Sequence, residues 1–264
     1  MELRRWALDA LCESDPARKA ASTRELHEAA EGLAIEPHAP PATLPVPGRP
    51  RRPELVHPAK VPRRSPTKPE GLAALLHAIA HIEFNAINLA LDAAWRFDDG
   101  LPREFRLDWL RVAAEEAYHF SLLRDHLATL GHAYGDFPAH DNLWQMCEKT
   151  SHDVVARMAL VPRTLEARGL DATPQIQQKL RQAGTPDALR AVDILDVILR
   201  DEVGHVAIGN HWYRWLCARD GLDPVAHYRV LVERHAAPRL HPPFNEAARR
   251  RAGFSDEEIA ILLG

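Results

Sequence analysis

AEEAYHFSLL (114–123) and LRDEVGHVAIG (199–209) are the two stretches that decide the fold. Each contains the pattern Glu-x-x-His, as Glu116/His119 and as Glu202/His205. Apolar residues three and four positions away put both pairs on the apolar stripe of a helix. Burying a carboxylate beside an imidazole costs several kcal/mol per group unless each is paired or bound to a cation. The two stretches therefore predict a metal site inside a helical core.

Helical periodicity extends well beyond these motifs. Apolar residues at helical spacing predict four long helices, at Glu70–Phe97, Asp108–Leu130, Asp141–Ala167 and from Thr185 through Trp212. Pro162 predicts a kink in the third. No segment alternates as a strand, so we predict an all-α fold in which the four helices form an antiparallel bundle.

Differences in composition divide the rest of the chain into an N-terminal appendage, a connector and a C-terminal tail. Residues 37–69 hold eleven of the 21 prolines, which predicts an irregular connector that crosses the surface. Before it, residues 1–36 predict a helical appendage. We expect the bundle at residues 70–220 and a short helical tail that packs on it at residues 221–264.

The other two bundle helices each carry an acid on their apolar face, Glu83 in the first and Glu166 in the third. Glu83 precedes Glu116 by 33 residues and Glu166 precedes Glu202 by 36, so the chain reads as two similar helical hairpins. One Glu from each of two helices plus Glu-x-x-His from each of the others is the ligand pattern of di-iron and di-manganese carboxylate bundles of the ferritin-like class.

The pattern assigns a role to each ligand. Glu116 and Glu202 would bridge two ions, Glu83 and Glu166 would be terminal ligands, and His119 and His205 would each bind one ion. Six oxygen and nitrogen donors without sulfur favour iron or manganese over zinc or copper. We expect two iron ions, with Mn/Fe and Mn/Mn pairs left open.

Other candidate ligands are weaker. Glu54/His57 repeats the Glu-x-x-His spacing, but it lies in the connector, where no helix aligns the side chains. His77 and His81 flank the Glu83 stripe, and a hydrogen-bonded or surface role is favoured for them. Glu115 and Asp201 directly precede the motif glutamates. We expect both to accept a hydrogen bond from the ligand histidines, the alternative being solvated acids on charged helices.

Composition bears on the class of the protein and on its expected cellular location. The net charge of −4 does not favour a dedicated nucleic-acid binder. The three cysteines are far apart, which does not favour a disulfide framework. The N-terminus lacks the apolar stretch of a secretory signal and no apolar run approaches about 18 residues, so we expect a cytoplasmic protein without membrane spans. A solvated linker is the favoured interpretation of the basic connector, with contact to tRNA left open. Its basic residues are Arg49, Arg51, Arg52, Lys60, Arg63, Arg64 and Lys68.

Five phrases carry a resemblance to a known family. In order they are AEEAYHFSLL (114–123), YGDFPAHDNLW (134–144), VPRTLEARGLD (161–171), LRDEVGHVAIG (199–209) and PPFNEAARRRAGF (242–254). They resemble the bacterial ferritin-like family known as domain of unknown function 455 (DUF455), over about Glu70–Gly253. The bundle and ligand pattern are more distantly similar to a tRNA-modifying di-iron hydroxylase. The resemblance implies the fold and the metal site but no substrate.

Three functions fit these observations. We favour a di-iron oxidase or oxygenase that activates O2, receives electrons from a donor and oxidises or hydroxylates an unidentified substrate. The alternative is a ferroxidase or iron-handling protein without an organic substrate. The N-terminal extension and the C-terminal tail are awkward for a storage cage. A third possibility is a binding or structural protein that keeps the metals for stability.

Overall fold

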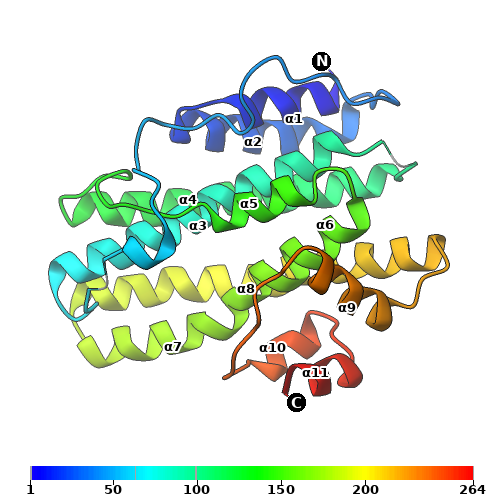
Figure 1. The fold of residues 1–264 in the computed structure, drawn as a ribbon. Coiled ribbons are helices and arrows are strands. Elements are labelled where there is room, and N and C mark those ends of the chain that lie inside the picture. The colour runs from blue at the N-terminus through cyan, green and yellow to red at the C-terminus, as the bar shows by residue number, and fades with distance from the viewer. Residues whose placement is uncertain (1, 63, 99, 264) are drawn as a thin grey trace. The chain divides into compact units, whose positions relative to one another are not determined.

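The computed structural model describes residues 2–62, 64–98 and 100–263; Arg63 of the basic connector lies outside these ranges. Within them the chain forms helices, turns and extended loops and no β-strand (Figure 1). The predicted all-α fold class is confirmed.

The chain divides into two compact units. Unit 1 comprises Met1–Gln145 and Lys179–Ile194, and unit 2 comprises Met146–Gln178 and Leu195–Gly264. The helices of unit 1 are α1 (Leu3–Cys12), α2 (Pro16–Ala29), α3 (Pro69–Arg96) and α4 (Arg103–Thr129), with short 3-10 turns η1 (Ala30–Gly32) and η2 (Pro58–Lys60). The helices of unit 2 are α6 (Val154–Leu160), the π-helix η3 (Val161–Glu166), α9 (Pro224–Arg234), α10 (Glu246–Arg251) and α11 (Asp256–Leu263). Residues of both units belong to α5 (Asn142–Lys149), α7 (Ala167–Ala183) and α8 (Pro186–Arg219).

Helix α3 is the apolar centre of unit 1. Its most apolar stretch of 18 residues has a mean hydropathy of 1.3, so its length and composition alone would allow it to cross a membrane. However, 78% of that stretch is buried inside the protein. The buried side chains include the polar residues His77, Asn88 and Asp92 as well as apolar ones. These features are typical of the core helix of a globular protein.

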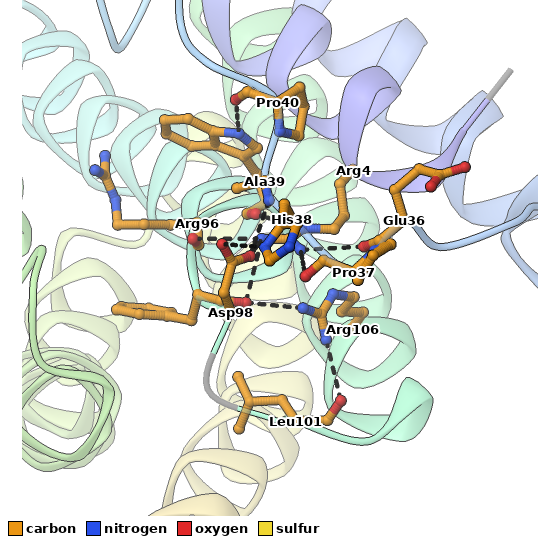
Figure 2. Close-up of polar contacts among 12 residues, drawn as sticks. Arg4, Glu36, Pro37, His38, Ala39, Pro40, Arg96, Asp98, Leu101 and Arg106 are labelled. Carbon is orange, nitrogen blue, oxygen red and sulfur yellow. Dashed lines mark hydrogen bonds and ion pairs between the residues drawn. The ribbon is translucent and has the colours of Figure 1, made fainter.

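Arg4 of α1 closes the C-terminal end of α3. Its buried guanidinium donates from Nε to the carbonyl oxygen of Trp95 at 2.8 Å and from Nη2 to that of Phe97 at 3.3 Å, and it pairs with Asp98 (Figure 2). Arg106 of α4 donates from Nη2 to the same Phe97 oxygen at 2.8 Å. The last carbonyl groups of a helix have no partner within it and carry partial negative charge. The two cations supply those partners and join α1 and α4 to the end of α3.

Lys19 of α2 forms a second attachment to α3. Its buried Nζ donates to the carbonyl oxygens of Leu11 at 2.9 Å and Gly48 at 3.0 Å, and to the side-chain oxygen of Asn88 on α3. Burial lowers the pKa of Lys19 to about 7. A Cβ at position 48 would lie 2.0 Å from the carbonyl oxygen of Cys12, so only glycine allows the connector to approach this closely.

The proline-rich connector is irregular, as predicted. Within its described residues it contains one short helical element, the 3-10 turn at Pro58–Lys60, before α3 begins at Pro69. The connector is nevertheless pinned to the loop that follows α4. Val56 donates its N–H to the carbonyl oxygen of Ala139 at 2.8 Å, and Ala139 donates to that of Glu54 at 3.0 Å.

The continuous third helix predicted at 141–167 is wrong. Helix α5 ends at Lys149, and residues 150–153 separate it from α6. Asp153 starts the new helix, because its carboxylate accepts a hydrogen bond from the N–H of Ala156 at 2.9 Å. The Ser-His-Asp run at 151–153 therefore acts as a helix start inside a segment whose apolar periodicity is otherwise unbroken.

The predicted kink at Pro162 takes the form of the π-helix η3. Proline has no N–H to donate to the carbonyl group four residues earlier, and its ring would clash with that carbonyl in an α-helix. The wider turn avoids the clash, and the N–H of Ala167 donates to the carbonyl oxygen of Pro162, five residues earlier. Single π-helical turns are frequent at functional sites.

Two other helix boundaries differ from the prediction. Helix α4 begins at Arg103 and not at Asp108, because Phe105 in the added turn is fully buried. Helix α7 does not end before Gly169 but continues to Ala183. Apolar packing of its buried leucines, Leu170 and Leu180, outweighs the unfavourable helix propensity of the glycine.

The C-terminal helices belong to the core of unit 2. Ala248, Ala252, Phe254 and Ile259 form one buried cluster with residues of α7 and α8. On α8 the cluster includes Val206, which directly follows His205.

Candidate metal centre

Glu83 is a buried acid in the middle of α3. Its side chain is about 5% exposed, and one and two turns before it lie the buried residues Ile79, Ala80 and Leu76. An uncompensated carboxylate in such surroundings is strongly destabilising, which requires a proton, a counter-charge or a cation at this position.

Glu116 and His119 lie on one face of α4. Both side chains are fully buried, and Ala113 and Phe120 bracket them on the same apolar face. The spacing of three residues brings the two side chains together: His119 Nδ1 lies 3.3 Å from Glu116 Oε2.

The three residues of unit 1 form one group. His119 Nδ1 also lies 3.3 Å from Glu83 Oε2, so the imidazole contacts carboxylates of both α3 and α4. One ligand atom from each of Glu83, Glu116 and His119 can be chosen such that all lie within 4.8 Å of one another. Ligands about 2.1 Å from a common ion would be at most about 4.2 Å apart, so small side-chain movements would complete three bonds to one metal.

The electrostatics of this group favour a bound cation. Burial, together with the nearby Glu116 carboxylate, raises the pKa of Glu83 well above its ordinary value, and the contact with His119 offsets only part of this increase. The two buried carboxylates therefore repel each other unless a proton or metal ion is present. Oxygen and imidazole donors of this kind suit iron and manganese.

Unit 2 contains the second Glu-x-x-His pair. Glu202 and His205 are buried on α8, and His205 Nδ1 lies 3.5 Å from Glu202 Oε1. Glu166 is also buried, and it is the last residue of η3. Each unit therefore buries two acids and one histidine of the predicted ligand set.

Close helix packing fixes the segment that carries Glu166. A Cβ at Gly209 of α8 would lie 2.6 Å from Cβ of Pro162 and 2.7 Å from its Cγ, so the proline ring packs directly against the glycine. Thr164 Oγ1 donates to the carbonyl oxygen of Ala159 at 2.8 Å and supports the wider π-helical turn. The position of Glu166 thus depends on an irregular backbone held against α8.

The two acids that precede the motif glutamates are partly exposed. Asp201 accepts hydrogen bonds from its neighbour Arg200, at 2.8 Å from Nε and 3.1 Å from Nη2. Glu115 is half-buried on α4. Their role as acceptors for the ligand histidines stays a prediction.

His77 and His81 belong to a different environment, in line with the favoured interpretation of them. The N–H of Gly135 donates to His77 Nε2 at 2.9 Å, and His81 Nδ1 lies 2.8 Å from the hydroxyl group of Tyr134. Burial lowers the pKa of His77 to about 4 and that of His81 to about 3, so both imidazoles are neutral at pH 7. They attach the loop after α4 to α3.

Two residues near the ligands escaped the sequence analysis. Arg163 is buried on η3 and forms an ion pair with Glu258 of α11, which anchors the segment that ends at Glu166. Its signal in the sequence was an arginine within a mostly apolar stretch. The second missed residue is Gly209, and its signal was a glycine one turn beyond His205 on the apolar face.

Comparison with known proteins identifies the family. The family described as "Protein of unknown function (DUF455)" matches residues 12–260. The chain belongs to the DUF455 family. An uncharacterized protein of Haemophilus influenzae is 54% identical over 216 residues, which cover 80% of this chain and 74% of that relative. No solved structure matches the chain. The DUF455 resemblance read from the five sequence phrases is confirmed, and the match also includes α2 and the connector.

Proposed function

We propose that this DUF455 protein is a di-metal carboxylate protein of the ferritin-like class that uses O2 to oxidise or hydroxylate a substrate. The observation that carries the proposal is that each unit buries two glutamates and a histidine, and that in unit 1 these side chains already lie within metal-binding distance. In the proposed arrangement α3, α4, α8 and the segment from α6 to α7 form an antiparallel four-helix bundle. The ligands of its centre are Glu83, Glu116, His119, Glu166, Glu202 and His205.

The donor set fits two iron ions, with manganese in one or both positions as the alternative. Glu116 and Glu202 would bridge the ions, Glu83 and Glu166 would each bind one, and each histidine would complete one coordination shell. Two divalent cations would offset the charge of the four buried carboxylates, which otherwise must bind protons or water.

The chemistry divides between the metal and the chain. Bound iron would supply the redox capacity for reducing O2, and an external donor must provide two electrons. In a hydroxylation, O2, two electrons, two protons and a C–H bond give one alcohol and one water. Glu83 would hold a proton on its carboxyl group until a cation replaces it, because its pKa is raised. Burial of Glu116 and His119 would keep bulk water from the centre.

Metal content and O2 consumption test the proposal. We expect two iron or manganese ions per chain by mass spectrometry, and O2 uptake by the reduced protein in an oxygen electrode. His119→Ala should lose at least one ion, and Glu202→Ala should weaken the binding of both. Asp125→Asn on α4 and Asp193→Asn on α8 are matched controls, because both carboxylates are exposed, and they should keep the full metal content.

The other candidate functions predict different results. A zinc-only protein, or metal content that survives both ligand substitutions, would refute oxidative chemistry at this centre. Large cage-like particles that take up iron without an added substrate would instead support the ferroxidase alternative. Bound iron without O2 consumption would leave a metal-stabilised binding protein.

A further inference from the structure

Unit 2 contains a surface groove that none of the predicted ligands lines. Its volume is about 410 Å³, within the range of small-molecule sites. One wall is the part of α8 that follows His205 and includes His211, Arg214 and Trp215. The other wall is the end of α10 and the turn after it, with Arg251 and Gly253.

Hydrogen bonds hold the two walls of the groove together. Asn210 is buried and donates from its side-chain nitrogen to the carbonyl oxygen of Ala252 at 2.7 Å. Arg214 donates from Nη2 to the carbonyl oxygen of Gly253 at 2.6 Å and to Glu258 Oε2 at 2.8 Å. Gly253 has a φ of +88°, a conformation that favours glycine. The groove is therefore a preformed feature of the fold.

The charge of the groove is positive. Two arginines line it, Arg214 and Arg251, and its lining contains no acidic residue. Glu258, outside the lining, pairs with Arg214 at 2.8 Å, so the excess positive charge comes from Arg251. Arg251 is exposed and forms no ion pair with the described residues. Its neighbour Arg250 differs, because it pairs with Glu246 at 3.4 Å and with Asp256 at 3.1 Å. An arginine without an acidic partner beside a second guanidinium is suited to bind phosphate or carboxylate oxygens.

An aromatic surface lies beside the two cations. The half-buried indole of Trp215 lines the groove and packs against Trp212, with ring centroids 5.6 Å apart in an edge-to-face arrangement. The guanidinium of Arg219 lies 5.6 Å from the centre of the same indole. This packing keeps the ring in place as a flat apolar wall, on which a planar ligand group could stack.

We propose that this groove binds a phosphate monoester that carries a flat ring, such as a nucleoside monophosphate. Arg251 and Arg214 contact the phosphate oxygens, and the ring lies against Trp215. A bidentate contact of guanidinium with phosphate gives both strength and orientation. The site is separate from the proposed metal centre, although α8 carries residues of both.

Isothermal titration calorimetry of the full chain with AMP, inorganic phosphate and adenosine tests this proposal. We expect saturable binding of AMP, with weaker binding of phosphate or adenosine alone. Arg251→Gln should weaken AMP binding about tenfold, as expected for loss of one charge-assisted hydrogen bond. Arg250→Gln removes the same charge from the adjacent position and should leave the affinity unchanged. Trp215→Leu should weaken AMP but not phosphate, and Trp215→Phe should restore most of the AMP affinity.

Several results would overturn the proposal. These are the absence of saturable AMP binding, equal losses for Arg250→Gln and Arg251→Gln, and adenosine binding as tight as that of AMP. Metal content measured on the same samples keeps the two proposals apart. Arg251→Gln should retain full metal content, and loss of the metal centre by His119→Ala should leave AMP binding in place.

Discussion

Each unit buries two glutamates and one histidine of the predicted ligand set, but the backbone that carries them differs between the units. In unit 1, Glu83 lies on one uninterrupted helix and Glu116 and His119 lie on another. In unit 2, Glu166 ends a π-helix. The ligands of unit 1, like Glu202 and His205 on α8, follow from regular helix geometry, whereas the position of Glu166 depends on contacts between distant parts of the chain.

The buried cations of the two units also have different partners. In unit 1, Arg4 and Lys19 donate mainly to backbone carbonyl groups. In unit 2, Arg249 pairs with Asp171 at 2.6 Å, and Glu258 accepts from Arg163 and Arg214. Burial alone would raise the pKa of Glu258, but the nearby Arg163 guanidinium holds it below its ordinary value. These cations of unit 1 therefore bind mainly backbone carbonyl groups, whereas those of unit 2 bind carboxylates.

The largest expected effect is that of Arg249→Met. The substitution removes a fully buried guanidinium and leaves Asp171, whose side chain is 11% exposed, without its partner. Breaking a buried pair on one side costs about 3–5 kcal/mol. Urea unfolding should therefore show a large loss of stability, and adding Asp171→Leu should recover part of it.

Arg4→Met provides the comparison from unit 1. Its carbonyl partners lie beside Asp98, which is 44% exposed, so water can replace some of the lost hydrogen bonds. We expect a loss of about 2–3 kcal/mol, nearer to the cost of unsatisfied carbonyl groups than to that of a buried charge. A loss as large as that of Arg249→Met would show that the two units do not differ in this respect.

The next effect concerns the π-helix. Gly209→Ala would place a methyl group 2.6 Å from Cβ of Pro162 and force η3 away from α8. Overpacking of this kind costs about 1–3 kcal/mol, and the displacement of Glu166 should also lower metal content.

Gly204→Ala is the matched control on the same helix. A Cβ added at Gly204 would have no neighbouring atom within 4 Å. Because alanine has a higher helix propensity than glycine, the substitution should raise the free energy of unfolding by about 0.5–1 kcal/mol. Thermal unfolding of the metal-free variants compares the two. Equal effects at both positions would show that the contact between Pro162 and Gly209 does not hold η3 in place.

Regular elements were predictable from the sequence. The apolar stripe of α3 predicted the burial of Glu83, and the spacing of three residues predicted the contact between Glu116 and His119. Both inferences need only helix periodicity and the cost of buried charge. The proline density of the connector likewise predicted an irregular segment.

Features set by long-range contacts were not predictable in this way. Pro162 predicts that the helix is irregular at this point. Whether the helix kinks, stops or widens there depends on Gly209, 47 residues later. The break at 150–153 is a local feature, but it was missed because the helix cap at Asp153 competes with an apolar periodicity that continues through it. The partners of Arg163 and Arg249 lie on other helices, and ion pairing between distant residues leaves no periodic pattern.

A further effect in unit 1 is the pH dependence contributed by His77. Its folded pKa is about 4, against an ordinary value of 6.5, because burial disfavours the charged imidazole. Between pH 6.5 and 4 the unfolded chain therefore binds a proton that the folded chain does not. The stability contributed by the neutral histidine is complete above pH 6.5 and is lost as the pH falls toward 4.

His77→Gln tests this contribution, because glutamine can still accept the hydrogen bond from Gly135 but does not titrate in this range. The stability of the wild type minus that of the variant should fall by about 2–3 kcal/mol between pH 6.5 and 4 and be nearly flat from pH 7 to 8. The difference cancels the opposite contribution of Glu83, whose raised pKa favours the folded state in acid. Urea unfolding of both proteins at several pH values measures this difference in stability. A difference that stays constant with pH would mean that the loop after α4 opens and lets His77 protonate in the folded protein. In that outcome the contact between His77 and this loop would contribute little to the stability of unit 1.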